Sequence, residues 1–336
     1  MERRAFLTGT GAVLLVAPLA TEAQQPRKIV RVGIVLAGAT PSPEEIATTA
    51  ATNPFVLAMK ELGWIEGQNM VIERRYGDSP DQRRAAIASL VRLPVDVLLV
   101  SGVAPARLAQ LETKTIPIVV MAGGDLVANG LVASVARPGG NLTGLQALQD
   151  DLGGKRLELL KLLVPNLSRV ATLDYDVSYP GAPQGSIRYG QKAAEAARIL
   201  GLELHPLFVR QPGEIAAAFL DMAKNRDQGL LVFPSNSASF HRQRIVDLAA
   251  KHRLPAIYPS RINVVAGGLV SYGVNDPETQ RRAAVYVDKI LRGAKPGELP
   301  IEQATKFELI INSKTAKALG LTIPQSLLSR ADEVIE

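Results

Sequence analysis

Polar residues follow the short apolar runs of this chain, where the strands of a parallel sheet would present them to a ligand. In the first half these residues are Ser101, Gly102, Gly123 and Asp125. A helix beginning near Pro105 would point backbone N–H groups, together with the Ser101 hydroxyl, at a carboxylate, because helix N-termini attract anions. The Asp125 carboxylate could bind an ammonium group, or it could instead cap a helix.

The second half carries a comparable set at its strand ends: Asp174, Tyr175, Ser235, Asn236, Tyr258, Arg261 and Tyr272. The rings of Tyr175 and Tyr258 could stack on a planar ligand, or they could be core residues with hydroxyls in water. Arg261 could hold a carboxylate through two N–H donors, or it could pair with an acid in its own half. Together the two sets predict a binding site for a small molecule.

The residue patterns of several other chemistries are missing from the sequence. Gly153-Gly154-Lys155 is no phosphate loop, because Gln149 and Arg156 stand where that motif needs Gly and Ser or Thr. The three histidines lack metal-ligand spacing, and there is no Gly-x-Ser-x-Gly motif. We therefore expect no enzyme activity, no metal and no cofactor.

Composition and the first residues point to an exported protein. Residues 1–23 resemble a cleavable signal peptide, with Arg3-Arg4, an apolar stretch and the small residues Thr21 and Ala23; the paired arginines also allow the twin-arginine route. No apolar run reaches the roughly 18 residues of a membrane span. The chain has no cysteine to form disulfides or carry lipid, and its net charge of +6 forms no basic block for nucleic acid. We expect a periplasmic monomer.

The pattern of strands and helices that would position these residues occurs twice along the sequence. Val32 and Val170 open similar apolar runs 138 residues apart, and the helical stretches ending at Gly63 and Gly201 have the same separation. Two ordinary βαβ halves could also converge on such a pattern. Short Val-, Ile- and Leu-rich runs that alternate with amphipathic stretches, such as 81–92 and 241–251, are typical of parallel strands with crossover helices. The sequence predicts two doubly wound α/β lobes.

The chain continues beyond the second half, which suggests how the lobes are joined. A helix over 278–291 and a strand over 306–311 follow the Gly-rich stretch 267–273. We predict lobe 1 from residues 28–142 plus 273–304 and lobe 2 from 145–269 plus 312–336. Connecting strands near 142–145, 269–273 and 305–311 would form a three-strand hinge.

Several segments together resemble the periplasmic substrate-binding proteins of ABC transporters, related to tryptophan- and tyrosine-binding members. They are Thr115–Val119, Gly130–Ser134, Ala136–Gly144, Gly154–Leu160, Leu254–Tyr258, Gly267–Gly273, Thr305–Leu309 and Ala318–Pro324. The resemblance covers nearly the whole chain after the export signal. It implies a type I periplasmic binding fold, a permease in the inner membrane with a cytoplasmic ATPase as partners, and no bound cofactor.

The chain departs from that family in two loops that would face a ligand. Residues 37–53 are polar and alanine-rich, where many relatives carry an aromatic or Ser-Gly segment, and the loop beginning Tyr258-Pro259 ends in Ser260-Arg261, where amino-acid binders usually place an acid. An aromatic or other amino acid is the favoured ligand. Two alternatives stay open: a ligand-sensing module for a membrane receptor, and an enzyme built on tandem βαβ halves.

Overall fold

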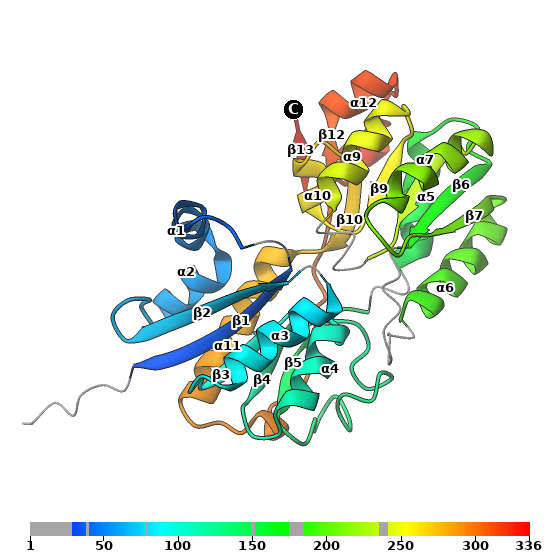
Figure 1. Cartoon of the computed structure of the whole chain (residues 1–336). Coiled ribbons are helices and arrows are strands. Elements are labelled where there is room, and N and C mark those ends of the chain that lie inside the picture. Colours follow the sequence, from blue (N-terminus) through cyan, green and yellow to red (C-terminus); the bar gives the residue numbers. More distant parts are fainter. Residues whose placement is uncertain (1–28, 38–39, 78, 149–151, 175–184, 235–240) are drawn as a thin grey trace, which may run out of the picture.

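A computed structural model describes residues 29–37, 40–77, 79–148, 152–174, 185–234 and 241–336. They form two α/β lobes: Figure 1 shows lobe 1 in blue and cyan with an orange helix, and lobe 2 in green, yellow and red. None of the helices in these ranges is both long and apolar enough to cross a bilayer.

Lobe 1 is built on a six-stranded sheet. Its strands are β1 (Val30–Ala37), β2 (Met70–Gly77), β3 (Val97–Val100), β4 (Ile118–Gly123), β5 (Leu142–Gln146) and β11 (Glu302–Gln303). They lie in the order β11-β5-β4-β3-β1-β2 with parallel pairings. The helices of this lobe are α1 (Pro43–Thr52), α2 (Pro54–Glu61), α3 (Pro80–Val91), α4 (Val103–Glu112) and α11 (Asp276–Leu291), with a short 3-10 helix, η1 (Pro296–Glu298).

Lobe 2 is built on a seven-stranded sheet. Its strands are β6 (Arg169–Asp174), β7 (Glu203–Phe208), β8 (Gly229–Val232), β9 (Ala256–Tyr258), β10 (Val270–Val274), β12 (Phe307–Asn312) and β13 (Glu333–Ile335). They lie in the order β13-β12-β10-β9-β8-β6-β7. The helices are α5 (Leu152–Leu163), α6 (Gly185–Leu200), α7 (Glu214–Lys224), α9 (Arg242–Lys251), α10 (Arg261–Val265), α12 (Ser313–Leu319) and α13 (Gln325–Leu328).

Helices cover both faces of each sheet. Successive side chains of a strand point to opposite faces, so each strand contributes to two apolar clusters. In β3, Val97 and Leu99 pack in one cluster with α2 and α11, whereas Leu98 and Val100 pack in another with α3 and α4. In lobe 2, α5 and α6 cover one face, and α7 and α9 cover the other. Strands that are buried on both faces must be apolar throughout, as the sequence pattern indicated. The prediction of two doubly wound lobes is confirmed.

One pairing departs from the parallel pattern, because β12 runs antiparallel to β10. The course of the chain explains this direction. β10 leaves lobe 2 at its carboxyl end, and after α11, η1 and β11 in lobe 1 the chain enters lobe 2 again beside it as β12. A strand that returns at the same end must run in the opposite direction.

The chain passes between the lobes three times: after β5, after β10 and before β12. The strands expected near 142–145, 269–273 and 305–311 correspond to β5, β10 and β12, and each of them lies inside a sheet. The connections themselves therefore lie between the strands of one lobe and the next element of the other. A small apolar cluster of Ala147, Val274 and Ala304, with Phe307 against it, packs the three connections together.

Candidate functional site

The carboxyl ends of β3 and β4 lie side by side in lobe 1 and bring together four of the predicted residues: Ser101, Gly102, Gly123 and Asp125. The Gly102 N–H donates to the Ala122 carbonyl over 2.7 Å, which links the two strand ends. Sequence spacing placed these residues correctly because neighbouring parallel strands end at the same edge of a sheet.

The N-terminus of α4 faces this region, but its donors differ from those expected. The helix begins at Val103, two residues before the expected start, and Gly102 precedes it with φ of 93°, which favours glycine. The Gly102 amide is already bonded to Ala122, so it is not a free donor to a ligand. Among the described residues no side chain caps this helix. The Val103 and Ala104 amides of its first turn are therefore the better candidates for holding an anion.

Asp125 has the capping role that was one of its two interpretations. Its Oδ1 accepts a hydrogen bond from the Ala128 amide at 2.9 Å, and its backbone carbonyl accepts from the Asn129 amide at 3.0 Å. The segment that it caps is a turn and not an α-helix. Gly123 also has a packing reason: a Cβ there would lie 2.7 Å from the Leu126 side chain.

The strand ends of lobe 2 are described in part. Asp174 is the last residue of β6 and is 5% exposed, and its carbonyl accepts from the Val209 amide at 2.9 Å. Tyr175, Ser235 and Asn236 lie outside the described residues. Asp174 is thus one of the acids that the structure places at this edge of lobe 2.

Tyr258 is a core residue in this structure. It is 1% exposed and packs in the cluster between the sheet and helices α7 and α9. Burial raises the pKa of its phenol above the ordinary value. Gly268 leaves space for the ring, since a Cβ there would lie 2.6 Å from the Tyr258 Cε2 atom. The stacking interpretation of this residue does not fit its position.

Arg261 pairs with acids in its own lobe, which was the second interpretation of that residue. Its guanidinium lies 2.9 Å from Glu333 Oε2 and 3.9 Å from Glu308 Oε2. Tyr272, in contrast, is only partly buried, and its ring centroid lies 6.2 Å from that of Phe307 at the third connection. Its position leaves it as a candidate for ligand contact.

The sequence analysis missed Arg156, which is 0% exposed and lies in α5. Its Nε donates to the Tyr272 carbonyl and its Nη1 to the Tyr189 hydroxyl, each over 2.7 Å. Tyr189 in turn packs edge-on against Phe233, with centroids 4.4 Å apart. A signal was present in the sequence: Arg156 occupies an apolar-periodic position four residues before Leu160, where an arginine is unusual.

A second missed group lies where α11 begins. Asn275 Nδ2 donates to Glu308 Oε2 at 2.8 Å, and the Ser260 hydroxyl donates to Asp276 Oδ2 at 2.6 Å. Burial raises the pKa of Asp276, while the Ser260 hydrogen bond and Arg261 lower it. Burial also raises the pKa of Glu308 to about 7, against the opposing effect of Arg261. The sequence carried no local signal for this group, because its members come from segments far apart in the chain.

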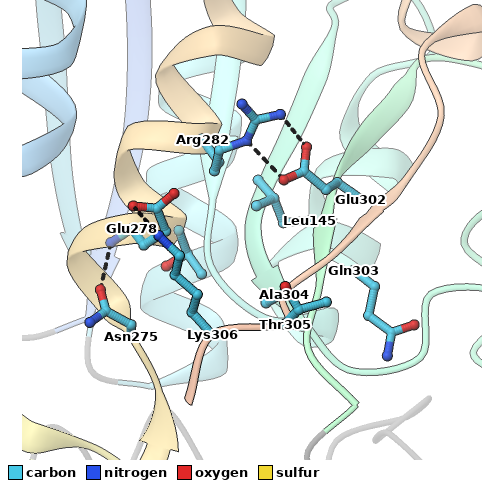
Figure 2. Close-up of a pocket in the computed structure, with 10 residues that line it drawn as sticks. Leu145, Asn275, Glu278, Arg282, Glu302, Gln303, Ala304, Thr305 and Lys306 are labelled. Carbon is cyan, nitrogen blue, oxygen red and sulfur yellow. Dashed lines mark hydrogen bonds and ion pairs between the residues drawn. The ribbon is translucent and has the colours of Figure 1, made fainter. Parts of the chain in front are cut away.

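A pocket lies beside these residues, between α11, β11 and the third connection (Figure 2). Its charges neutralise one another: Arg282 binds both Glu302 oxygens at 2.8 and 2.5 Å, and Lys306 lies 3.8 Å from Glu278. None of the residues predicted to bind ligand lines this pocket. Its ion pairs suit a joint between the lobes better than a ligand site.

The family model for ABC transporter substrate-binding proteins matches residues 29–335. The chain belongs to this family. A similar protein is the tyrosine-binding protein of Clostridioides difficile, which is 26% identical over 274 residues and is matched over 81% of this chain and 76% of that protein.

Two solved structures share the architecture of this chain. A conserved domain protein from Vibrio cholerae superimposes with a TM-score of 0.80 at 25% identity, covering 91% of this chain and 100% of that one. An ABC domain from Streptococcus pneumoniae in complex with L-Trp gives 0.79 at 23% identity, covering 91% and 99%. This substrate-binding protein therefore has the type I periplasmic binding fold that the resemblance implied.

Proposed function

We propose that this chain captures a small molecule between its two lobes and delivers it, as a monomer, to an ABC permease powered by a cytoplasmic ATPase. Membership of the substrate-binding family supports the role. The three connections, packed around one small apolar cluster, support a hinge about which the lobes close on the ligand. Such a protein binds its ligand without changing it chemically, so we expect no catalysis.

We propose an aromatic or other amino acid as the ligand. The observation that carries this proposal is the tyrosine-binding relative, which matches most of both chains. The L-Trp complex of the Streptococcus pneumoniae protein is consistent with it. An amino acid also has the three features for which the strand ends offer partners: a carboxylate, an ammonium group and an apolar side chain.

Each ligand feature has a candidate partner. The first turn of α4 and Ser101 would bind the carboxylate, because the N-terminus of a helix carries partial positive charge. Asp174 or Asp125 would bind the ammonium group, and Tyr272, with Tyr175 from beyond the described residues, would contact the apolar body. We leave out Tyr258, which is buried in the core, and Arg261, which is paired with Glu333.

The test is a thermal-shift panel on protein that has been unfolded and refolded to remove any ligand carried through purification. The panel holds aromatic and branched amino acids, small carboxylates, sugars and nucleosides. A ligand at a hundred times its dissociation constant stabilises the native state by about 2.7 kcal/mol. Stabilisation by an aromatic amino acid supports the proposal. Stabilisation only by carboxylates that lack an amine would show that the ammonium site is wrong.

Substitution of the acids separates their roles. A hydrogen bond to a charged group contributes about 1.5–3 kcal/mol, so Asp174→Asn or Asp125→Asn should weaken amino-acid binding by about ten- to a hundredfold. Glu298→Gln makes the same chemical change at a side chain that is 72% exposed, and it should bind like the wild type. Unchanged affinity in both Asp variants would remove these residues from the site.

We also propose export to the periplasm with removal of residues 1–23, which lie outside the described part of the chain. The mature N-terminus would then be Gln24, which intact-mass measurement can check. Replacing Arg3 and Arg4 by Lys keeps the charge but removes both guanidinium groups. Loss of export in this variant indicates the twin-arginine route, and normal export indicates the general route.

A further inference from the structure

Asn275 joins the two lobes through the two ends of its side-chain amide. Its Oδ1 accepts from the Glu278 amide at 2.9 Å and so caps α11, which packs in lobe 1. Its Nδ2 donates to Glu308 on β12, which belongs to the sheet of lobe 2. The start of a lobe 1 helix is thus held by a carboxyl group of lobe 2.

A second contact holds the same turn of helix. Ser260, in the loop between β9 and α10 of lobe 2, donates to Asp276, the first residue of α11. The backbone N–H of Asn275 also donates to the Lys306 carbonyl, over 3.0 Å, at the third connection. These bonds fix the direction in which the chain leaves β10, and with it the orientation of lobe 1 relative to lobe 2.

Glu308 is the buried member of this set, with 5% exposure. Its Oε2 accepts from Asn275, whereas Oε1 is buried without a hydrogen-bond partner in the described part of the chain. A buried carboxylate oxygen without a donor is unfavourable, because it has lost its hydration. A neutral carboxyl group in the same place costs less to bury, because it carries no net charge.

The charged groups around Glu308 come from every neighbouring element. Arg261 of α10 favours the carboxylate, whereas Asp276 of α11 and Asp332 and Glu333 at β13 favour the neutral acid. Burial has the largest effect, and the result is a pKa raised from 4.5 to about 7. The protonation state of Glu308 therefore changes close to neutral pH.

We propose that Glu308 is a protonation latch for the angle between the lobes. The neutral acid favours the arrangement seen here, with α11 held against lobe 2, and the carboxylate favours an arrangement in which the start of α11 has moved and Glu308 is hydrated. The sign follows from linkage: a carboxyl group with a raised pKa stabilises its surroundings at low pH and loses that effect as pH rises through the raised value. The latch depends on the proposed hinge movement but operates without ligand.

Fluorescence energy transfer between the lobes tests the latch in ligand-free protein. The chain has no cysteine, so Lys114→Cys in lobe 1 and Lys224→Cys in lobe 2, both at exposed positions, carry one dye each. In an otherwise wild-type chain, transfer should change between about pH 5 and about pH 9, with a midpoint within about one unit of the expected pKa. Glu308→Gln should keep the low-pH value throughout, and the matched variant Glu298→Gln should titrate like the wild type.

A second variant keeps the test informative if Glu308→Gln folds poorly. Arg261→Gln removes the charge that favours the carboxylate, so its midpoint should move to higher pH. The latch is refuted if transfer in the wild type does not depend on pH, or if Glu308→Gln titrates as the wild type does.

Adding an aromatic amino acid distinguishes the latch from the proposed function. If energy transfer changes with the amino acid but not with pH, the proposed function stands and the latch is rejected. If transfer changes with pH but not with the amino acid, the latch is supported and the proposed ligand class is rejected.

Discussion

Arg156 shows how one charged residue can be accommodated in the core of lobe 2. Its guanidinium is fully buried, and it donates to a carbonyl of β10 and a hydroxyl of α6 while its Cζ lies 5.6 Å from the centre of the Tyr189 ring. These partners come from two elements, β10 and α6, that both pack against α5. The planar, forked guanidinium can reach both, whereas a lysine ammonium could not.

We predict that Arg156→Met lowers the free energy of unfolding by about 2–5 kcal/mol, because it leaves two buried polar groups without their donor at about 1–3 kcal/mol each. Arg156→Lys should lie between this variant and the wild type. Urea unfolding measures the change, with Arg210→Met, at an exposed position, as the control. A loss no larger than that of the control would mean that the buried bonds contribute little.

Glu308 should also give lobe 2 a characteristic pH dependence of stability. Its pKa in the folded chain is raised from 4.5 to about 7, so the folded state binds the proton more tightly than the unfolded state does. Its contribution is therefore complete below about pH 4.5 and is lost as pH rises through about 7. We expect the melting temperature of the wild type, measured relative to that of Glu308→Gln, to fall across this range. A constant difference would place the pKa of Glu308 near its ordinary value.

At the scale of elements, the first turn of α11 has two roles: it caps the helix, as in an ordinary helix, and it also bonds the helix to lobe 2. Asn53 caps α2 by accepting from the Phe55 and Val56 amides, and Asn275 makes the equivalent bond in α11 while also donating to Glu308. Loss of a helix cap alone costs about 1 kcal/mol.

Replacing each of these asparagines by aspartate separates the two roles, since aspartate keeps the capping oxygen but loses the amide donor. Asn53→Asp should be nearly neutral or slightly stabilising, because negative charge is favoured at a helix N-terminus. Asn275→Asp should be destabilising, since it places a further carboxylate against Glu308, which already lies near Asp276, Asp332 and Glu333. Chemical unfolding of the two variants makes the comparison, and equal stabilities would argue against a significant Asn275–Glu308 bond.

The positions of the elements could be predicted from the sequence, but the surroundings of several side chains could not. β3 and β8 read as apolar runs because both faces of each strand are buried. Tyr258 and Tyr272 both stand near strand ends, yet Tyr258 is buried beneath α7 and α9, whereas Tyr272 is only partly buried against the cluster on the other face of the sheet. Which tyrosine is covered depends on packing between distant segments. The same holds for Ser260 and Asp276, which meet only after the chain has passed through β10.

At the scale of the molecule, lobe 2 is completed by the end of the chain. β12, α12 and α13 supply Leu309, Ile311, Ala316 and Leu327 to its main apolar cluster. Lobe 1, in contrast, obtains all six strands of its sheet before residue 304. The two lobes therefore differ in how much they need the last residues.

We predict that a chain ending at Gln303 loses the structure of lobe 2 selectively. Hydrogen exchange should become fast in β6, β8 and β9 while β1 and β3 stay protected, because the removed segment completes the core of lobe 2, whereas lobe 1 loses contacts only at the connections and at the start of α11. A chain ending at Asp332 loses only β13 and should retain protection in both lobes. Equal loss of protection in both lobes of the shorter chain would show that they fold as one unit.

The edge strands of both sheets affect whether the protein aggregates at high concentration. An exposed edge strand can add a strand from another molecule, which leads to aggregation, and short or charged edges and prolines discourage it. In lobe 1 the outer strands are the two-residue β11 and the charged β2, with Glu73, Arg74 and Arg75. In lobe 2 they are the three-residue β13 and β7, where Pro206 removes an N–H donor two residues before the exposed Phe208. All four borders thus resist sheet extension, so the protein can accumulate to high concentration without joining strand to strand.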